Sequence, residues 1–261
     1  MTSPVNTVVA TPGVDKSGTR VRSMFGEIAG RYDLLNHVLS LGVDVYWRWR
    51  TVRTIPPVGT EPLLDVCTGT GDLAMAYARK SAEEVAIIGA DFTPQMLQIA
   101  REKGATAQRA KKIRHAPAFV EADAQALPFA SNQFQIVSVS FGLRNVADTR
   151  RGLRELTRVC RPGGHVAVLE FSQPSSRLFG AVYRWYFKHV LPRIGQLVSG
   201  SRLDAYNYLP QSVGEFPNGQ ALADVMVECG LSEVRFRPLT FGIATLYWGR
   251  KPIVEDGDGR A

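Results

Sequence analysis

The sequence predicts an α/β protein with a mostly parallel sheet. Short apolar segments typical of buried strands alternate with helical segments from residue 62 to residue 172. Strands that alternate with helices need right-handed crossover connections, which place the strands parallel in one sheet. Near the end of the chain, segments 233–239 and 242–249 alternate apolar and polar residues and follow each other closely. They predict a hairpin that adds an antiparallel strand.

The individual elements follow from these patterns in chain order. Residues 22–55 mix aromatic and aliphatic side chains at helical spacing and predict two or three helices, broken at Gly30 and Gly42. The helix over 93–105 begins with Thr93 as N-cap and Pro94 at the first helical position. Two further helices are expected over 71–80 and 148–160, and the parallel strands over 62–67, 85–91, 116–123, 134–143 and 165–172.

Composition indicates one domain in a reducing compartment. The chain has 261 residues, a formal net charge of +7 and three cysteines without paired or metal-like spacing. The polar, Pro- and Gly-containing stretch 1–20 predicts a disordered tail, and 253–261 predicts a second flexible tail. Between them, 21–252 is expected to form the single domain. No apolar run reaches the roughly 20 residues of a membrane span, and no secretory signal is expected.

A glycine-rich turn marks the expected ligand site. In "LDVCTGTGDLA" (64–74), Gly69 permits a tight turn and Gly71 lets a ligand approach the backbone beside a helix N-terminus. Asp91 ends the next strand, where a carboxylate accepts hydrogen bonds from ribose hydroxyls. NAD and S-adenosylmethionine both suit this arrangement.

Two further acids favour S-adenosylmethionine over NAD. Asp65 precedes the turn and would hold a cationic sulfonium amino acid, whereas it would repel a pyrophosphate. Asp123 follows the third strand and could accept a hydrogen bond from the adenine amine. The alternatives are a loop-bracing acid at Asp65 and a solvated strand-end acid at Asp123. A parallel sheet that ends in a hairpin likewise fits the Rossmann-like class I methyltransferase architecture better than the ordinary dinucleotide fold.

Longer sequence blocks resemble one family. They are "RYDLLNHVLSLG" (31–42), "LDVCTGTGDLA" (64–74), "ADAQALPF" (122–129), "SFGLRNVAD" (140–148), "RVCRPGGHVAVLEFSQP" (158–174), "HVLPRIG" (189–195), "YLPQSV" (208–213) and "LTFGIATLYWGRK" (239–251). In this order they resemble the ubiquinone/menaquinone C-methyltransferases of the UbiE/MenG type over residues 24–251. "FGLRNV" is far more diagnostic than the glycine turn.

The resemblance implies methyl transfer from S-adenosylmethionine to a ring carbon of a polyprenylated quinol. Demethylmenaquinol is the expected substrate because that activity is the more widely shared one in the family, and a benzoquinol is the alternative. Together, the turn and the resemblance give the candidate cofactor-binding set Asp65, Gly69, Thr70, Gly71, Asp91, Phe92, Asp123, Ala124 and Ser140. The chain departs from many relatives at Asp44 and Val45, where those have a His-Arg pair.

Carbon methylation needs a group that stabilises a developing phenolate on the quinol ring. Arg144 stays protonated, so it is assigned to charge stabilisation or water polarisation rather than to a base role. Asn145 is assigned to orienting the phenol or that water, and Tyr32 to completing the hydrogen-bond set. The alternative is that Arg144 and Asn145 only cap a strand and brace a loop. Cys67 is expected to be a packing residue beside the turn.

The expected partners are a lipid-like quinol and, through it, a membrane surface. Residues 175–220 are expected to form a substrate insert, in which 178–198 interleaves aromatic, aliphatic and basic residues. That segment suits a lid, an interfacial helix or a helix packed on the core. The scattered histidines predict no metal site. We therefore expect a cytoplasmic protein with peripheral membrane contact. Three alternative functions remain: an NAD-dependent oxidoreductase, a nucleic-acid methyltransferase and a non-catalytic membrane-associated binding protein. No base-flipping pocket or basic recognition element is found, so no nucleic-acid partner is expected.

Overall fold

The computed structural model describes residues 15–40, 42–81, 85–174 and 205–253. Within them, seven strands form one sheet in the order β3-β2-β1-β4-β5-β7-β6. The strands are β1 (Leu63–Val66), β2 (Ile87–Asp91), β3 (Ala118–Glu121), β4 (Phe134–Ser140), β5 (Cys160–Phe171), β6 (Ser232–Leu239) and β7 (Ala244–Arg250). β1 to β5 are parallel, and β7 runs antiparallel to both β5 and β6. The prediction of a parallel sheet closed by a hairpin is confirmed.

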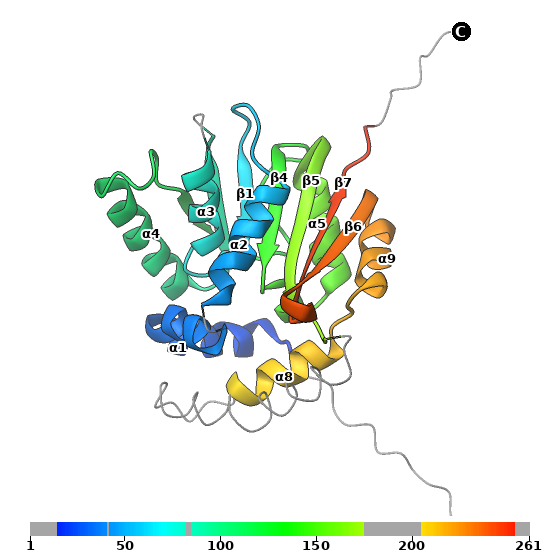
Figure 1. Cartoon of the computed structure of the whole chain (residues 1–261), viewed down its shortest axis with the longest axis horizontal. Coiled ribbons are helices and arrows are strands. Elements are labelled where there is room, and N and C mark those ends of the chain that lie inside the picture. The colour runs from blue at the N-terminus through cyan, green and yellow to red at the C-terminus, as the bar shows by residue number, and fades with distance from the viewer. Residues whose placement is uncertain (1–14, 41, 82–84, 175–204, 254–261) are drawn as a thin grey trace, which may run out of the picture.

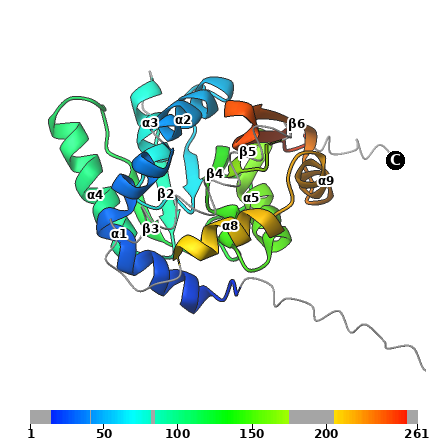
Figure 2. The ribbon, with the colours of Figure 1, turned by 60° about the horizontal axis from the view of Figure 1, so that its bottom comes forward.

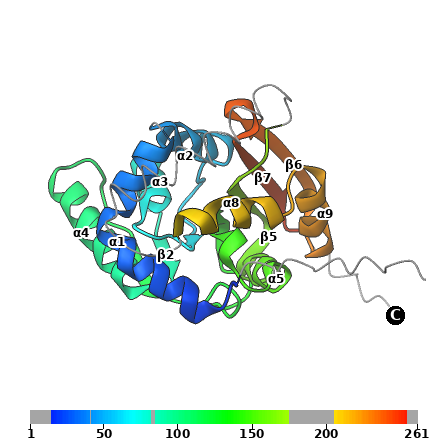
Figure 3. The same ribbon diagram turned by 90° about the horizontal axis from the view of Figure 1, so that it is seen from below.

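Helices cover both faces of the sheet (Figure 3). α2 (Val43–Thr54) and α3 (Asp72–Lys80) pack on one face, where Leu63 and Ile87 are buried against them. α5 (Thr149–Val159) and α9 (Gln220–Glu228) pack on the other face against Leu64 and Val66. Successive residues of β1 therefore point to opposite layers, as the period of two in a strand requires.

Two helices lie across the carboxyl ends of the parallel strands (Figures 1 and 2). α1 (Gly18–Ser40) contacts α4 (Pro94–Arg109) and α2, and α8 (Ala205–Glu215) contacts the short helix η1 (Leu143–Asn145). This edge is where open α/β sheets bind their ligands, since the crossovers leave a crevice there. α1 and α8 thus roof the region that the sequence assigns to the ligand.

The element boundaries differ from the sequence prediction most clearly in α1 and β5. α1 begins at Gly18, inside the expected tail, and continues through Gly30 without a break, because one glycine costs a buttressed helix only about 1 kcal/mol. Gly42 does separate α1 from α2, with a positive φ of 77°. β5 begins at Cys160 rather than 165, since Cys160 already pairs with Phe134 across a register shift. The segment 178–198 lies outside the described residues.

Candidate functional site

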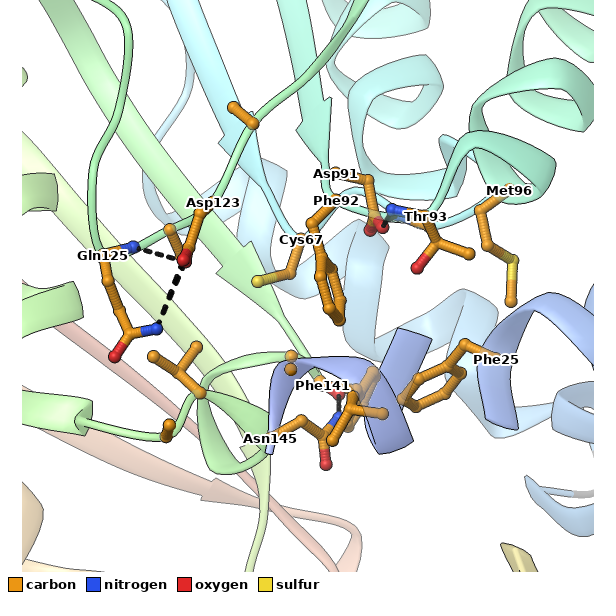
Figure 4. Close-up of a pocket in the computed structure, with 18 of the residues that line it drawn as sticks. Phe25, Cys67, Asp91, Phe92, Thr93, Met96, Asp123, Gln125, Phe141 and Asn145 are labelled. Atoms are coloured by element: carbon orange, nitrogen blue, oxygen red, sulfur yellow. Dashed lines mark hydrogen bonds between the residues drawn. The ribbon is translucent and has the colours of Figure 1, made fainter. Parts of the chain in front are cut away.

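A cleft opens at the carboxyl edge of the sheet, between α1 and the loops that follow β1, β2, β3 and β4 (Figure 4). Its empty volume is about 730 Å³, including the open mouth. The lining combines acidic, aromatic and small side chains. It includes the candidate residues Tyr32, Gly69, Asp91, Phe92, Asp123, Ala124, Ser140 and Asn145.

The glycine turn forms one wall of the cleft. Gly69 and Gly71 have φ of 56° and 83°, in the left-handed region that favours glycine. A Cβ at Gly71 would lie 2.9 Å from the ring of Phe119, so only glycine fits between α3 and that ring. Gly69 lines the cleft, whereas Gly71 does not. Gly71 is therefore needed for the conformation of the turn, whereas Gly69 is the glycine of the turn that a ligand in the cleft would contact.

Asp91 fastens the end of β2 to the glycine turn. Its Oδ2 accepts the Gly69 N–H at 2.8 Å, and its Oδ1 accepts the Thr93 N–H at 2.9 Å. Burial raises the pKa of this carboxyl, while both backbone hydrogen bonds lower it. Each oxygen of a carboxylate accepts about two hydrogen bonds, so both retain capacity on a side chain that lines the cleft. The geometry suits a pair of vicinal hydroxyl donors.

Asp123 lies across the cleft from Asp91 (Figure 4). Its Oδ1 accepts from the backbone N–H of Gln125 at 2.9 Å, and the side-chain amide of Gln125 donates to Oδ1 at 3.3 Å and to Oδ2 at 3.4 Å. The side chain of Asp123 is exposed, so each oxygen keeps room for a further donor. The ring of Phe92 lies between the two acids in this view. An acceptor at each end and an aromatic face between them suit a nucleoside.

Asp65 lies where it braces the loop, which was the alternative to a direct contact with the cationic sulfonium amino acid. It is 1% exposed and does not line the cleft. Its oxygens accept from the hydroxyls of Thr68 at 2.6 Å and Ser138 at 2.7 Å. Burial raises the pKa of Asp65 to about 6, and the hydroxyl donors lower it. The strand period turns this side chain under the turn rather than toward the ligand.

Thr70 also points away from the cleft. Its hydroxyl donates to Asp33 of α1 at 2.5 Å and accepts from Lys103 of α4 at 3.1 Å. Lys103 in turn bridges Asp33 and Asp72, at 2.5 and 2.6 Å. This network ties α1 to the glycine turn and to the start of α3.

Two of the three expected catalytic residues line the cleft. Burial raises the pKa of the Tyr32 phenol, and a hydrogen bond with Asn36 lowers it. Asn145 follows β4 in η1, and its Oδ1 accepts from the hydroxyl of Tyr208 on α8 at 3.1 Å. The contact connects the roof helix α8 directly to the cleft.

Arg144, the third expected catalytic residue, lies behind the cleft and does not line it. Its Nη1 donates to the Phe141 carbonyl and to Glu170 Oε1, the latter at 2.7 Å. Arg144 is 5% exposed and Glu170 is fully buried. Since the guanidinium needs a partner at that depth, the ion pair draws the side chain inward.

Sequence reasoning missed Lys16, Phe25 and Met96, which also line the cleft. Among the described lining residues, Lys16 is the one basic side chain. Burial lowers the pKa of its ammonium, and Glu215 acts in the opposite direction. Lys16 lay in a stretch predicted to be a tail, and the sequence carried no signal that α1 would cover the cleft.

Cys67 lines the cleft as a packing residue. Burial raises the pKa of its thiol well above the ordinary value, and the carboxylates of Asp91 and Asp65 act in the same direction. A thiol with a raised pKa is a poor nucleophile. The described residues hold no cluster of three metal-ligating side chains.

Comparison with solved structures places the fold. The chain superposes on an S-adenosylmethionine-dependent methyltransferase from Thermotoga maritima with a TM-score of 0.61, 16% identity, and coverage of 88% of this chain and 98% of that one. It also superposes on the [4+2]-cyclase SpnF with a TM-score of 0.66, 17% identity, and coverage of 94% and 99%. The strand order and the cleft define a class I methyltransferase fold. Because the SpnF title names a cyclase, the fold alone does not decide the reaction.

Sequence relatives narrow the class to one family. The family model described as "ubiE/COQ5 methyltransferase family" matches residues 14–251. A demethylmenaquinone methyltransferase of Deinococcus radiodurans is 49% identical, covering 90% of this chain and 93% of the relative. The ubiquinone/menaquinone biosynthesis C-methyltransferase UbiE of Geobacter sulfurreducens is 44% identical, covering 91% of each. The chain belongs to the ubiE/COQ5 methyltransferase family, which confirms the resemblance found in the sequence.

Proposed function

We propose that the protein transfers a methyl group from S-adenosylmethionine to a ring carbon of a polyprenylated quinol, converting demethylmenaquinol to menaquinol. The observation that carries the proposal is the pairing of Asp91 and Asp123 in one cleft, in a chain of this family. Relatives named for demethylmenaquinone support the naphthoquinol substrate. A benzoquinol is not favoured.

The cleft fits S-adenosylmethionine better than NAD. Asp91 offers acceptors for ribose hydroxyls, Phe92 a face for adenine, and Asp123 an acceptor for the adenine amine. Both acids leave the site negative, which suits a sulfonium cation and opposes a pyrophosphate. When bound, S-adenosylmethionine supplies an electrophilic methyl group.

The quinol ring is assigned to the Asn145 end of the cleft. Asn145 can orient the phenolic hydroxyl, because Tyr208 occupies its Oδ1 and fixes the direction of its amide. Tyr32 supplies a neutral hydroxyl, since its phenol keeps its proton when its pKa is raised. Lys16 supplies a positive charge where a phenolate would form. Lys16 lines the same cleft as Asn145, and it is the one basic side chain among the described residues that line it.

Arg144 is assigned a positioning role. Its bonds to Phe141 and Glu170 hold the turn after β4, from which Asn145 projects into the cleft. Loss of Arg144 would therefore act on the reaction through Asn145. Direct charge stabilisation, the role that the sequence analysis gave to Arg144, is therefore assigned to Lys16.

The test is methyl transfer in vitro with isotopically labelled S-adenosylmethionine. Reduced demethylmenaquinol and a reduced demethyl-benzoquinol are offered separately and in competition, and the products are identified by mass spectrometry. We expect methylation of the naphthoquinol ring. Calorimetry should show binding of S-adenosylmethionine but not of NAD. Tight NAD binding without methyl transfer would instead support an oxidoreductase.

We also propose that the protein works in the cytoplasm, at the inner face of the membrane that dissolves its substrate. No helix among the described residues is long and apolar enough to cross a bilayer. A net charge of +7 favours contact with an anionic leaflet.

A further inference from the structure

The outer side of α2 exposes large apolar side chains to solvent. Val45, Tyr46 and Trp49 are 56%, 45% and 48% exposed, and they lie within one turn of the helix. Tyr46 and Trp49 stack with ring centroids 6.0 Å apart. With Arg53, one turn after Trp49, they form what we call the α2 outer face. Trp47, on the opposite side of the helix, is 2% exposed, so α2 buries one indole and exposes another.

The charge of this face is positive. The guanidinium of Arg53 lies 5.2 Å from the centre of the Trp49 ring, and that of Arg50 lies 5.9 Å from it. The one acid of α2, Asp44, is 3% exposed and accepts a hydrogen bond from Arg48. α2 therefore offers aromatic rings and guanidinium groups to solvent without an exposed carboxylate of its own.

The helix that carries the α2 outer face is fastened close to the edge of the sheet where the cleft opens. The indole N–H of Trp47 donates to the hydroxyl of Thr240 at 2.8 Å, which fastens α2 to the turn η3 (Thr240–Gly242). η3 leads into Ala244, the partner of Phe171 at the carboxyl end of β5. Phe241 of this turn is 76% exposed. Exposed apolar rings thus belong both to α2, which contacts the roof helix α1, and to η3 at the edge of the sheet.

We propose that the α2 outer face docks on the surface of an anionic lipid bilayer. Tyrosine and tryptophan favour the boundary between lipid and water, because one end of each side chain is apolar and the other polar. The guanidinium groups beside them complement anionic headgroups. The proposal rests on the proposed function, in which the substrate is dissolved in such a bilayer.

A second copy of the chain fits this face less well than a bilayer. A two-fold symmetric contact would place Arg50 and Arg53 of one copy against those of the other, with no exposed acid of α2 to separate them. Like charges brought together in this way oppose association. A negatively charged lipid surface involves no such repulsion, and the aromatic rings can enter its boundary with water.

Sedimentation with vesicles tests the proposal on the full chain. The vesicles are an equal mixture of phosphatidylglycerol and phosphatidylcholine, or phosphatidylcholine alone. The variants are Tyr46→Ser/Trp49→Ser and Arg53→Glu. Their controls are Val227→Ser, which changes an exposed apolar residue of α9, and Arg235→Glu, which reverses an exposed charge on β6. Far-ultraviolet circular dichroism and thermal unfolding establish that each variant is folded.

We expect wild type to bind the anionic vesicles in a salt-sensitive manner. Arg53→Glu should lose about tenfold or more in affinity, because each basic side chain at an anionic surface contributes roughly a factor of five and the substitution both removes a positive charge and adds a negative one. Tyr46→Ser/Trp49→Ser should also lose about tenfold or more, because it removes the two aromatic rings that would enter the boundary between lipid and water. The controls should bind within about twofold of wild type. The same α2 variants should methylate a short-chain, water-soluble quinol at the wild-type rate. If the wild-type protein does not methylate this quinol, the result would count against the proposed function but not against docking through the α2 outer face.

Three results would overturn the proposal. The first is equal vesicle binding by wild type and both α2 variants. The second is a dimer in sedimentation velocity that the variants abolish while vesicle binding is absent. The third is that the wild-type protein binds neither kind of vesicle but binds a single-stranded oligonucleotide in a salt-sensitive manner, and that the variants lose this binding.

Discussion

Arg144 and Glu170 form a buried ion pair directly behind the cleft, with Nη1 and Oε1 2.7 Å apart. Oε1 also accepts the backbone N–H of Phe171 at 2.9 Å, and Oε2 accepts that of Arg144 at 3.3 Å. The guanidinium lies over the ring of Phe171, 5.2 Å from its centre. One carboxylate therefore joins the end of β5 to the turn that carries Asn145.

Removing one partner of this pair should destabilise the protein strongly. Arg144→Met leaves the fully buried Glu170 without its counter-charge, and such losses amount to about 3–5 kcal/mol. The double variant Arg144→Met/Glu170→Gln should recover much of that free energy of unfolding, because no charge is left unpaired. Denaturant unfolding of the complete cycle measures the coupling. The exposed pair Arg150–Glu228 is the control and should couple by about 0–1 kcal/mol.

The same double variant separates positioning from direct catalysis. With saturating donor and a reduced quinol, we expect single-turnover methyl transfer within about tenfold of wild type if the role of Arg144 is to hold the turn. A loss of about 10²–10³ in a folded double variant would return Arg144 to direct charge stabilisation.

Asp91 should control the affinity for S-adenosylmethionine. Asp91→Asn keeps the size of the side chain and one oxygen acceptor but loses the charge that strengthens bonds to ribose hydroxyls. Such bonds contribute about 1.5–3 kcal/mol each, so affinity should fall about tenfold or more. Asp91→Ala should bind more weakly still, because it also frees the Gly69 N–H. Calorimetry measures both, with Asp224→Asn on the exposed side of α9 as control. Unchanged affinity in folded Asp91→Asn would contradict the assignment.

Asp65 should make the protein less stable as the pH rises from about 4 to 6. Its pKa is about 6 in the folded state against an ordinary value of 3.8, so the folded state binds the extra proton within this window. The free energy of unfolding then falls with pH, by at most about 3 kcal/mol from this group. Asp65→Asn removes the titration. The difference in unfolding free energy between variant and wild type should therefore shift in favour of the variant from pH 4 to pH 7.

The other carboxyl groups titrate in both proteins and cancel in that difference. Parallel stability curves for Asp65→Asn and wild type would mean that the Asp65 carboxyl titrates alike in the folded and unfolded states.

The sheet could be predicted because its signals are local. Short apolar runs mark the central parallel strands, a glycine turn follows β1, and the 3.6 and 2.0 periods separate helix from strand. The start of β5 and the extent of α1 could not be predicted, since both depend on distant partners. Cys160 is extended because it pairs with Phe134, and Gly30 stays helical because α1 is held on α2 and α4.

The same distinction between local and distant signals decides which site residues could be predicted. Gly69, Asp91 and Asp123 follow strand ends, so the topology brings them together wherever the family fold forms. The directions of Asp65, Thr70 and Arg144 depend on which buried partner each side chain meets. Ser138, Asp33 and Glu170 are those partners, and each lies more than 25 residues away along the chain. Spacing carries no information about such pairs.

Lys16 should be required for the chemical step. It is the one basic side chain among the described residues that line the cleft, and its ammonium would face the phenolate only as that charge develops. Lys16→Met should therefore lower kcat by about 10²–10³ while donor affinity changes little. Arg20→Gln, an exposed substitution one turn later in α1, is the control and should retain the wild-type rate.

The pH profile tests whether the charge of Lys16, rather than its bulk, matters. Burial lowers the pKa of its ammonium, with Glu215 of α8 and Glu170 of β5 raising it and Arg144 of η1 lowering it. The single-turnover rate of wild type should fall as the pH rises through that lowered pKa, because the ammonium loses its proton. Lys16→Arg should move this limb to higher pH, since a guanidinium stays protonated. A limb that stays in place in active Lys16→Arg, or a near-normal rate in folded Lys16→Met, would remove Lys16 from the reaction and leave Tyr32 and Asn145 to stabilise the phenolate.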